Sequence, residues 1–219
     1  DADRGRLRRK LEHFGEPPEA PLIAVLPGSR VDEIERHAEL FIEVMVRLLT
    51  RYPDARFVVP LVTRETRDRF QTVLWREAEV IVPRVQLLFG HADFALRAAD
   101  VALVASGTAT LEAAMLGCPQ VVSYRVSKTT AAIVMRKLTS PYVSLPNILA
   151  NDWCVPELLQ DAATPEALES ALTGLIEQPR LRAETQRAYA QMRAALRPPT
   201  SAAGDPLALA VLAQMRRQG

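Results

Sequence analysis

The chain has 219 residues, with 27 Lys and Arg against 26 Asp and Glu, and 48% of its residues are hydrophobic. This is the composition of a folded protein, and it excludes disordered and collagen-like classes. The net charge of +1 provides no general attraction for nucleic acid, so we expect no nucleic-acid partner. The longest uncharged stretch, Leu138 to Asn151, is shorter than the roughly 20 apolar residues that a membrane-spanning helix needs.

The first twenty residues differ from the rest because basic side chains crowd between Arg4 and Lys10. We interpret residues 1–20 as a basic linker that is either solvated or part of a helix. Because the chain begins with Asp1 instead of Met, we expect either that it was cut from a larger protein or that its start is missing.

From Pro21 onward, short aliphatic runs alternate with longer segments of helical period, as in repeated βα units. The expected strands are residues 22–26, 56–62, 85–89, 101–105, 120–124 and 142–145. The expected helices are residues 34–52, 65–78, 92–99, 108–116 and 129–138, followed by helices only beyond Pro165, with a break at Pro179. Because the strands are continuous apolar runs, they predict a parallel sheet covered on both faces. The fold class is therefore α/β: a doubly wound, Rossmann-like parallel sheet over residues 21–178, with a helical C-terminal extension over 179–219.

The loop after the first expected strand has the sequence Pro27-Gly28-Ser29-Arg30. Gly28 permits a tight turn, and Ser29 could cap the following helix with Asp32 in an S-x-x-D pattern. A helix N-terminus beside an arginine fork suits a phosphate group. A plain capped turn with a solvated arginine explains the same residues equally well.

The loop after the fourth expected strand contains Ser106, Gly107 and Thr108, which are small enough for a ligand to approach the backbone. Glu112 lies one turn into the next helix, which is otherwise apolar. This carboxylate could accept hydrogen bonds from a ribose, or it could pair with a nearby arginine such as Arg125. Two loops suited to phosphate binding, without a P-loop or G-x-G-x-x-G motif, indicate that the ligand is a nucleoside diphosphate compound.

Four strings, in this order, are LPGSRVDEI (26–34), ASGTATLE (105–112), YVSLPNILA (142–150) and VPELLQ (155–160). Together they resemble the carboxyl-terminal half of the bacterial lipid-A-disaccharide synthase family. The resemblance implies the UDP-sugar-binding domain of a GT-B type inverting hexosyltransferase. Its reaction joins UDP-2,3-diacylglucosamine to 2,3-diacylglucosamine 1-phosphate in a β-1,6 linkage and releases UDP.

Carried over by position, the resemblance implies donor contacts on both loops and beyond them. The residues are Gly28, Ser29 and Arg30 at the pyrophosphate, Ser106, Gly107 and Thr108 at phosphate, Glu112 at the ribose, and Asn147, Glu157 and Gln160 along the donor cleft. Arg30 would also stabilise the leaving group. The family's acceptor site and general base belong to the amino-terminal half, so we expect no catalytic base in this chain and no transfer by it alone. For Asn147, a satisfied loop amide is the alternative.

The resemblance also implies partners and a location. We expect the amino-terminal half of the same enzyme as a partner, and a cytoplasmic position at the inner face of the inner membrane. Residues 128–138 combine an apolar face with basic residues, which suits either an anionic membrane surface or a helix covering the sheet. No cofactor is expected. Asp1-Ala2-Asp3 has the D-x-D form of metal-dependent glycosyltransferases but follows no strand, so no metal is expected either. The alternatives are another UDP-GlcNAc enzyme of GT-B architecture and a non-catalytic nucleotide-sugar-binding module.

Overall fold

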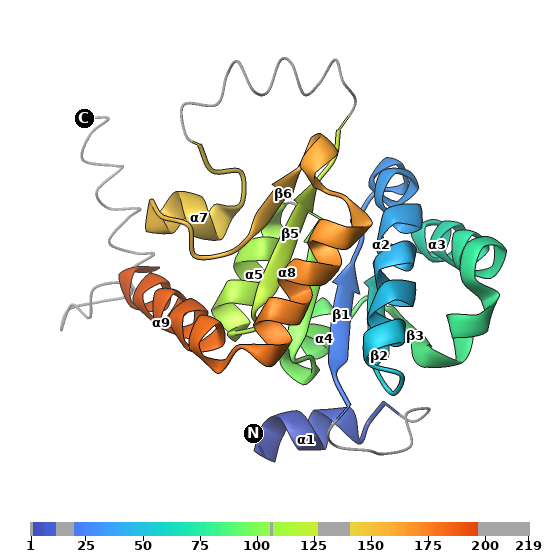
Figure 1. Cartoon of the computed structure of the whole chain (residues 1–219), viewed down its shortest axis with the longest axis horizontal. Coiled ribbons are helices and arrows are strands. Elements are labelled where there is room, and N and C mark those ends of the chain that lie inside the picture. Colours follow the sequence, from blue (N-terminus) through green and yellow to red (C-terminus); the bar gives the residue numbers. More distant parts are fainter. Residues whose placement is uncertain (1, 12–19, 106, 127–140, 197–219) are drawn as a thin grey trace, which may run out of the picture.

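The structure, a computed structural model, describes residues 2–11, 20–105, 107–126 and 141–196. Within these residues the strands form one six-stranded parallel sheet in the order β3-β2-β1-β4-β5-β6 (Figure 1). The strands are β1 (Leu22–Leu26), β2 (Arg56–Leu61), β3 (Val85–Phe89), β4 (Val101–Ala105), β5 (Gln120–Tyr124) and β6 (Glu157–Leu159).

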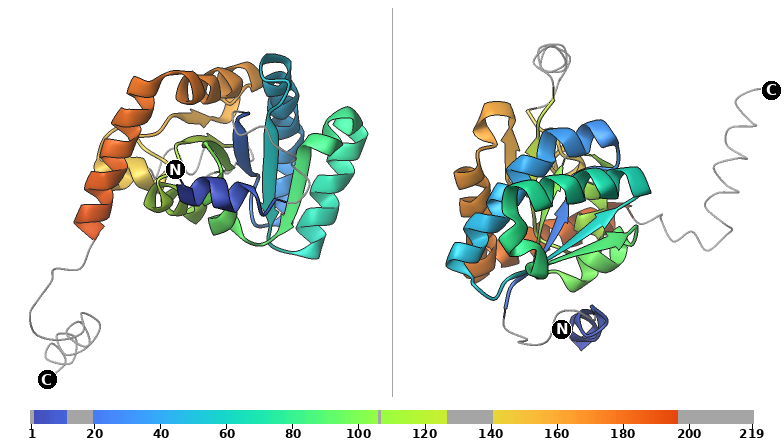
Figure 2. Two further views of the ribbon diagram at one scale, coloured as in Figure 1. Left: turned by 90° about the horizontal axis from the view of Figure 1, so that it is seen from below. Right: turned by 90° about the vertical axis from the view of Figure 1, so that its right-hand side faces the viewer.

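The helices are α1 (Ala2–Arg8), α2 (Val31–Arg51), α3 (Arg64–Ala78), α4 (Ala92–Ala98), α5 (Thr108–Leu116), α7 (Leu145–Ala150), α8 (Pro165–Glu177) and α9 (Pro179–Leu196), with 3-10 turns η1 (Glu79–Arg84) and η2 (Gln160–Ala162). Helices α2, α3 and α8 cover one face of the sheet, and α4 and α5 cover the other (Figures 1 and 2). Alternate residues of β1 pack on opposite faces: Ile23 and Val25 contact the first layer, whereas Ala24 contacts the second. Helices bury both faces of the sheet, which explains why the strands are continuous apolar runs.

The prediction of the fold class is confirmed, and the first five strands lie where the sequence placed them, apart from β2, which ends at Leu61 instead of Val62. The sixth strand was predicted wrongly. Residues 142–145 are not a strand, because Leu145 begins α7 with Pro146 near its first position, where proline is well tolerated. The sixth strand is instead Glu157–Leu159, which pairs in parallel with β5. The expected helix at 129–138 lies outside the described residues.

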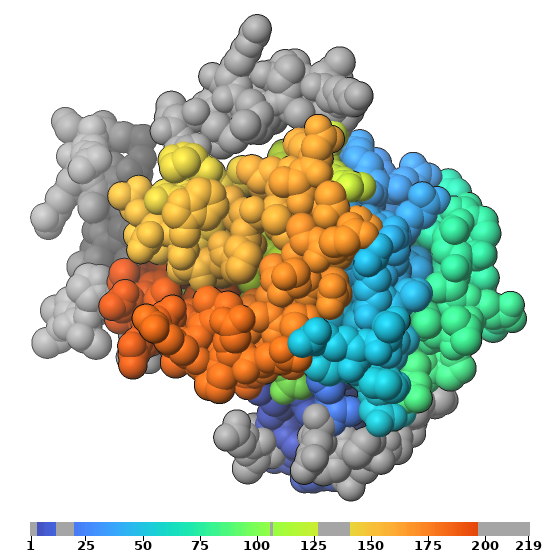
Figure 3. Space-filling model, in the orientation of Figure 1, coloured from blue at the N-terminus to red at the C-terminus, as the bar shows by residue number. Residues whose placement is uncertain are grey.

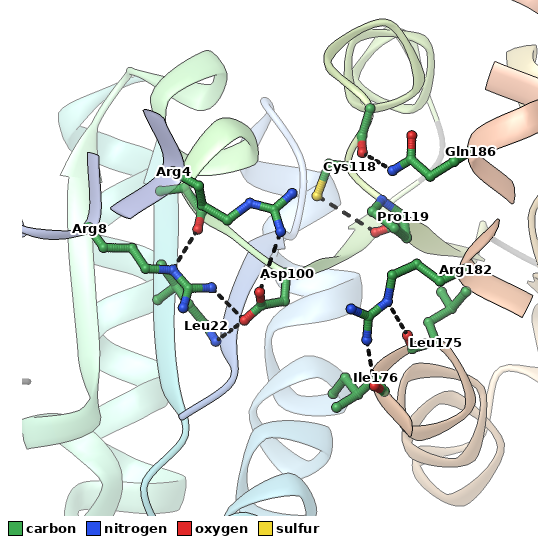
Figure 4. A network of polar contacts seen from close by, with 12 residues as sticks. Arg4, Arg8, Leu22, Asp100, Cys118, Pro119, Leu175, Ile176, Arg182 and Gln186 are labelled. Carbon is green, nitrogen blue, oxygen red and sulfur yellow. Dashed lines mark hydrogen bonds and ion pairs between the residues drawn. The ribbon is translucent and has the colours of Figure 1, made fainter. Parts of the chain in front are cut away.

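The basic start of the chain is a helix that packs on the sheet domain (Figure 4). The Arg8 guanidinium donates to the carbonyl of Ala98 over 3.0 Å and pairs with Asp100. The same carboxylate accepts from the backbone N–H of Leu22, at the start of β1. Leu11 is buried beside α4. Residues 2–8 are thus helical, which was one of the two interpretations of the basic segment.

Helix α9 covers the outer side of α5 and α7, and Figure 3 shows it beside α7 on the molecular surface. Its Tyr189 is fully buried in a cluster with Ala114 and Val122. None of the helices in the described part of the chain is long and apolar enough to cross a bilayer.

Candidate functional site

The order of the sheet reverses between β1 and β4, because the chain builds outward from β1 in one direction and from β4 in the other. These strands are parallel neighbours, with Leu26 beside Val104. The loops that follow them therefore start side by side at the carboxyl edge of the sheet. In doubly wound folds ligands bind at this switch point. Both loops that the sequence singled out flank it.

The first loop turns at Gly28, whose φ of +133° lies in the left-handed region. A Cβ atom at this position would lie 2.4 Å from Cβ of Glu33, so only glycine fits. Ser29 and Arg30 follow and are exposed, and the Arg30 side chain is 79% accessible. Helix α2 then begins at Val31. The loop thus presents a helix N-terminus and an exposed guanidinium, paired with Glu33 over 3.6 Å, at the same point.

The cap of α2 differs from the S-x-x-D pattern expected from the sequence. Arg30 and not Ser29 is the N-cap residue, so the third helical position falls on Glu33. The Glu33 carboxylate accepts from the backbone N–H of Ser29 at 2.7 Å and from that of Arg30 at 3.2 Å. Asp32, the residue expected in this role, pairs with Arg36 instead. The N–H groups that would bind an anion are therefore covered by an internal carboxylate, which is itself an anion at a helix N-terminus.

The second loop leads from β4 into α5. Ser106 lies outside the described residues. Gly107 has a φ of +147° and is exposed, and among the described residues a Cβ atom there would meet nothing within 4 Å. Thr108 is also exposed, whereas Thr110 is buried and donates from its hydroxyl to the Gly107 carbonyl over 2.8 Å. No described residue fills the space next to Gly107.

Glu112 is exposed on α5, so the argument that a buried carboxylate needs a partner does not apply to it. Arg125, the partner suggested by the sequence, donates to the carbonyl of Ala163 over 2.6 Å. No hydrogen bond or ion pair joins Glu112 to another described residue. Its carboxylate is free to accept hydrogen bonds from a ligand.

Asn147 and Glu157 meet in one internal network. The Asn147 amide donates to the Val155 carbonyl and, over 2.7 Å, to the Glu157 carboxylate. Its oxygen accepts from the backbone N–H groups of Cys154 and Val155, both at 2.9 Å. Glu157 also accepts from Ser144. Since Asn147 is fully buried and uses both amide hydrogens internally, the network fastens α7 to β6.

Gln160 directly follows β6 and is the first residue of η2. Its φ of +48° is left-handed, and its side-chain oxygen accepts from the backbone N–H of Val126 at 3.4 Å. The side chain is half-buried at the carboxyl edge of the sheet. It therefore lies on the edge where the two loops begin.

Two groups near the site were not identified from the sequence. Glu33 could have been found by placing the N-cap one residue later, which gives a capping box ending in Glu. His37 lies one turn further along α2, is 3% exposed and shares a hydrogen bond between its Nδ1 and the Glu33 carbonyl at 2.9 Å. Burial lowers the pKa of His37, and the Arg125 guanidinium acts in the same direction. A sequence signal for its burial exists, because His37 is three residues after Ile34 and four before Phe41, on the apolar face of the helix.

The described residues contain no cluster of three or more His, Cys, Asp or Glu side chains that could hold a metal ion. Both cysteines are free thiols. Burial raises the pKa of Cys118 to about 12 and that of Cys154 to about 11. Both thiols are thus protonated near neutral pH and are weak nucleophiles.

The sheet order and the position of the two loops define a Rossmann-like domain. Solved structures agree with this fold. The chain superimposes on UDP-GlcNAc 2-epimerase from Neisseria meningitidis bound to UDP-GlcNAc with a TM-score of 0.57 at 14% identity, covering 89% of this chain and 49% of that one. The C-terminal CMP-Kdo binding domain of WaaA from Acinetobacter baumannii also gives 0.57, at 12% identity, covering 87% and 96%. At these identities the likeness shows the fold.

The sequence relatives identify the family. Residues 5–211 match the family model described as lipid-A-disaccharide synthetase. The chain is 41% identical over 201 residues to lipid-A-disaccharide synthase of Chromobacterium violaceum. The matched residues cover 92% of this chain and 51% of the relative. It is 52% identical over 156 residues to that of Aromatoleum aromaticum, covering 71% and 40%. The chain belongs to the lipid-A-disaccharide synthetase family, and it spans about half the length of these curated relatives.

Proposed function

We propose that this chain is the donor-binding half of a lipid-A-disaccharide synthase. The reaction transfers 2,3-diacylglucosamine from UDP-2,3-diacylglucosamine to 2,3-diacylglucosamine 1-phosphate, with inversion, and releases UDP. The observation that carries the proposal is the pair of glycine loops at the switch point, with the exposed Arg30 beside them. Family membership supports the choice of a UDP-linked donor.

The chemistry assigned to the first loop is stabilisation of the leaving diphosphate. As the glycosidic bond breaks, negative charge grows on the UDP oxygens. The N–H groups of Ser29 and Arg30 and the Arg30 guanidinium would face that charge and stabilise it once the diphosphate is bound. The Glu33 carboxylate has to release these N–H groups when the diphosphate binds, because both anions use the same donors.

The remaining assignments follow the position of each residue at the carboxyl edge. Ser106, Gly107 and Thr108 would contact phosphate, and Glu112 would accept from the ribose hydroxyls. Gln160 would line the donor cleft. Asn147 and Glu157 would act there by holding α7 against β6 through the network described above.

We further propose that residues 21–178 form the UDP-sugar domain, that residues 1–20 link it to the acceptor half, and that 179–219 form a C-terminal extension. The general base would belong to the half of the relatives that this chain does not span. A cytoplasmic position at the inner membrane fits the acylated substrates, and it is supported by exposed apolar side chains at and after α7: Ile148, Leu149 and Trp153.

The direct test is a calorimetric titration of the chain with UDP, and with CDP and inorganic pyrophosphate for comparison. We expect UDP to bind more tightly than either competitor. Failure of UDP to bind, or equal affinity for UDP and pyrophosphate, would contradict a site that holds both the diphosphate and the nucleoside.

A further inference from the structure

Helix α5 carries the second loop at its start, yet its sequence gives it little stability of its own. It has nine residues, and isolated helices shorter than roughly 12–15 residues are marginal in water. Its one charged residue, Glu112, leaves no ion pair along the helix. The position of α5 therefore depends on its neighbours, which include β4, β5, α7 and α9.

Helix α9 reaches the start of α5 through a chain of buried polar groups. The Gln120 amide of β5 donates to the Tyr189 hydroxyl at 3.2 Å and to the Thr110 carbonyl at 2.8 Å. The Thr110 hydroxyl in turn donates to the Gly107 carbonyl at 2.8 Å. Tyr189, Gln120 and Thr110 all have an exposed fraction of 0%. An unbroken line of hydrogen bonds thus joins the C-terminal helix to the glycine of the second loop.

Helix α9 also holds the far end of α5. The Gln186 amide donates to the carbonyl of Gly117, and the Arg193 guanidinium donates to the carbonyl of Ala114 at 3.0 Å. The Ala114 carbonyl also accepts from the Gly117 N–H at 3.1 Å, so the bonds from α9 add to the cap at the C-terminal end of α5. With contacts at both ends, α9 fixes α5 along its axis.

We propose that α9 sets the position of the second loop, and that Tyr189 and Gln120 are positioning residues for donor binding. This inference rests on the proposed function for its ligand. The Tyr189 hydroxyl matters because Oε1 of Gln120 has no hydrogen-bond partner among the described residues. Without the hydroxyl, the Gln120 side chain keeps one bond and is free to rotate away from Thr110. The Gly107 turn then loses the support behind it.

The test is Tyr189→Phe, which removes one oxygen and keeps the buried ring. We expect UDP affinity to fall about two- to ten-fold, the effect of losing one hydrogen bond. Hydrogen exchange of the backbone amides in residues 107–111 should also become faster. The matched control is Tyr52→Phe, which removes the hydrogen bond from Tyr52 to Glu177 on the opposite face of the sheet and should change neither measurement.

A second variant tests the linkage. If Tyr189 acts through Gln120, the double variant Tyr189→Phe with Gln120→Leu should bind UDP no more weakly than Gln120→Leu alone. Additive losses would overturn the relay. Unchanged exchange at residues 107–111 in Tyr189→Phe would overturn the positioning itself, and faster exchange with unchanged UDP affinity would overturn its role in donor binding. If the unmodified chain does not bind UDP, the proposed function fails, while the exchange data still decide whether α9 positions the loop.

Discussion

Arg30 is the residue on which the proposed binding of the diphosphate depends most directly. Its guanidinium is 79% accessible, and its nearest acid oxygen, on Glu33, is 3.6 Å away. We expect Arg30→Ala to weaken UDP binding by about 1.5–3 kcal/mol, or roughly 10- to 150-fold, because a charge-assisted hydrogen bond is lost. The free energy of unfolding should change little, since exposed ion pairs contribute little.

Arg64 is a matched control for Arg30, because it also lies at the start of a helix that follows a strand of this sheet. Arg64 begins α3 after the adjacent strand β2, and its side chain is 91% accessible. Arg64→Ala should leave UDP affinity unchanged in the same calorimetric experiment. Equal affinity of the unmodified chain and Arg30→Ala would show that the diphosphate lies elsewhere.

Glu33 should oppose the ligand that Arg30 favours. Its carboxylate covers the Ser29 and Arg30 N–H groups, so Glu33→Gln removes a competing negative charge from the proposed phosphate position. We expect UDP affinity to rise about two- to five-fold, the usual size of a charge effect at a helix N-terminus. Glu65→Gln, in the first turn of α3, is the control and should have no effect. A loss of affinity in Glu33→Gln would mean that the carboxylate helps to build the site.

Glu112 should separate recognition of the nucleoside from recognition of the phosphates. Glu112→Gln keeps the side-chain volume and removes the charge from the oxygens that would accept from the ribose. UDP affinity should fall while pyrophosphate affinity stays the same, as measured by parallel titrations. Equal losses for both ligands would contradict a ribose contact.

At the site, the sequence predicted backbone features better than side-chain partners. The turn at Gly28 and the loop at Gly107 could be predicted because glycine marks positions whose backbone conformation other residues rarely adopt. The role of Glu33 could not, because a one-residue shift of the N-cap decides which acid reaches the turn. The Asn147 network could not be predicted either, since its partners come from a strand that the sequence placed in a different segment.

Helix α2 is the element that should make a metal ion unnecessary. Once Glu33 has released the N–H groups, the N-terminus of α2 and Arg30 together would place positive potential at the proposed diphosphate position. We therefore expect UDP affinity to be the same with EDTA and with Mg²⁺ in excess, by calorimetry. A strict requirement for Mg²⁺ would contradict this arrangement.

The strands show where periodicity succeeds and where it fails. The first five are runs of apolar residues between turn signals, and burial on both faces permits little else. Residues 142–145 have the same apolar character, but Pro146 starts a helix there. Residues 157–159 were assigned to no strand because they carry Glu157, and they form one because β5 offers an edge for pairing. Strand pairing of this kind depends on tertiary structure and cannot be predicted from a local sequence pattern.

For the whole molecule, which spans about half the length of its relatives, the proposed assignment separates donor binding from transfer. Glycosyl transfer with inversion needs a base on the acceptor hydroxyl, opposite the departing UDP, and a surface that holds both sugars at attack distance. In the proposed assignment the described loops supply the stabilisation of the leaving group and nothing that orients an acceptor. We expect the 219-residue chain to bind UDP but to form the disaccharide slower by several orders of magnitude than a protein of the relatives' full length. Incubation with both acylated substrates and detection of the disaccharide by mass spectrometry is the measurement, with full-length lipid-A-disaccharide synthase of Chromobacterium violaceum as the positive control. Ready turnover by this chain alone would place the catalytic base among its own residues.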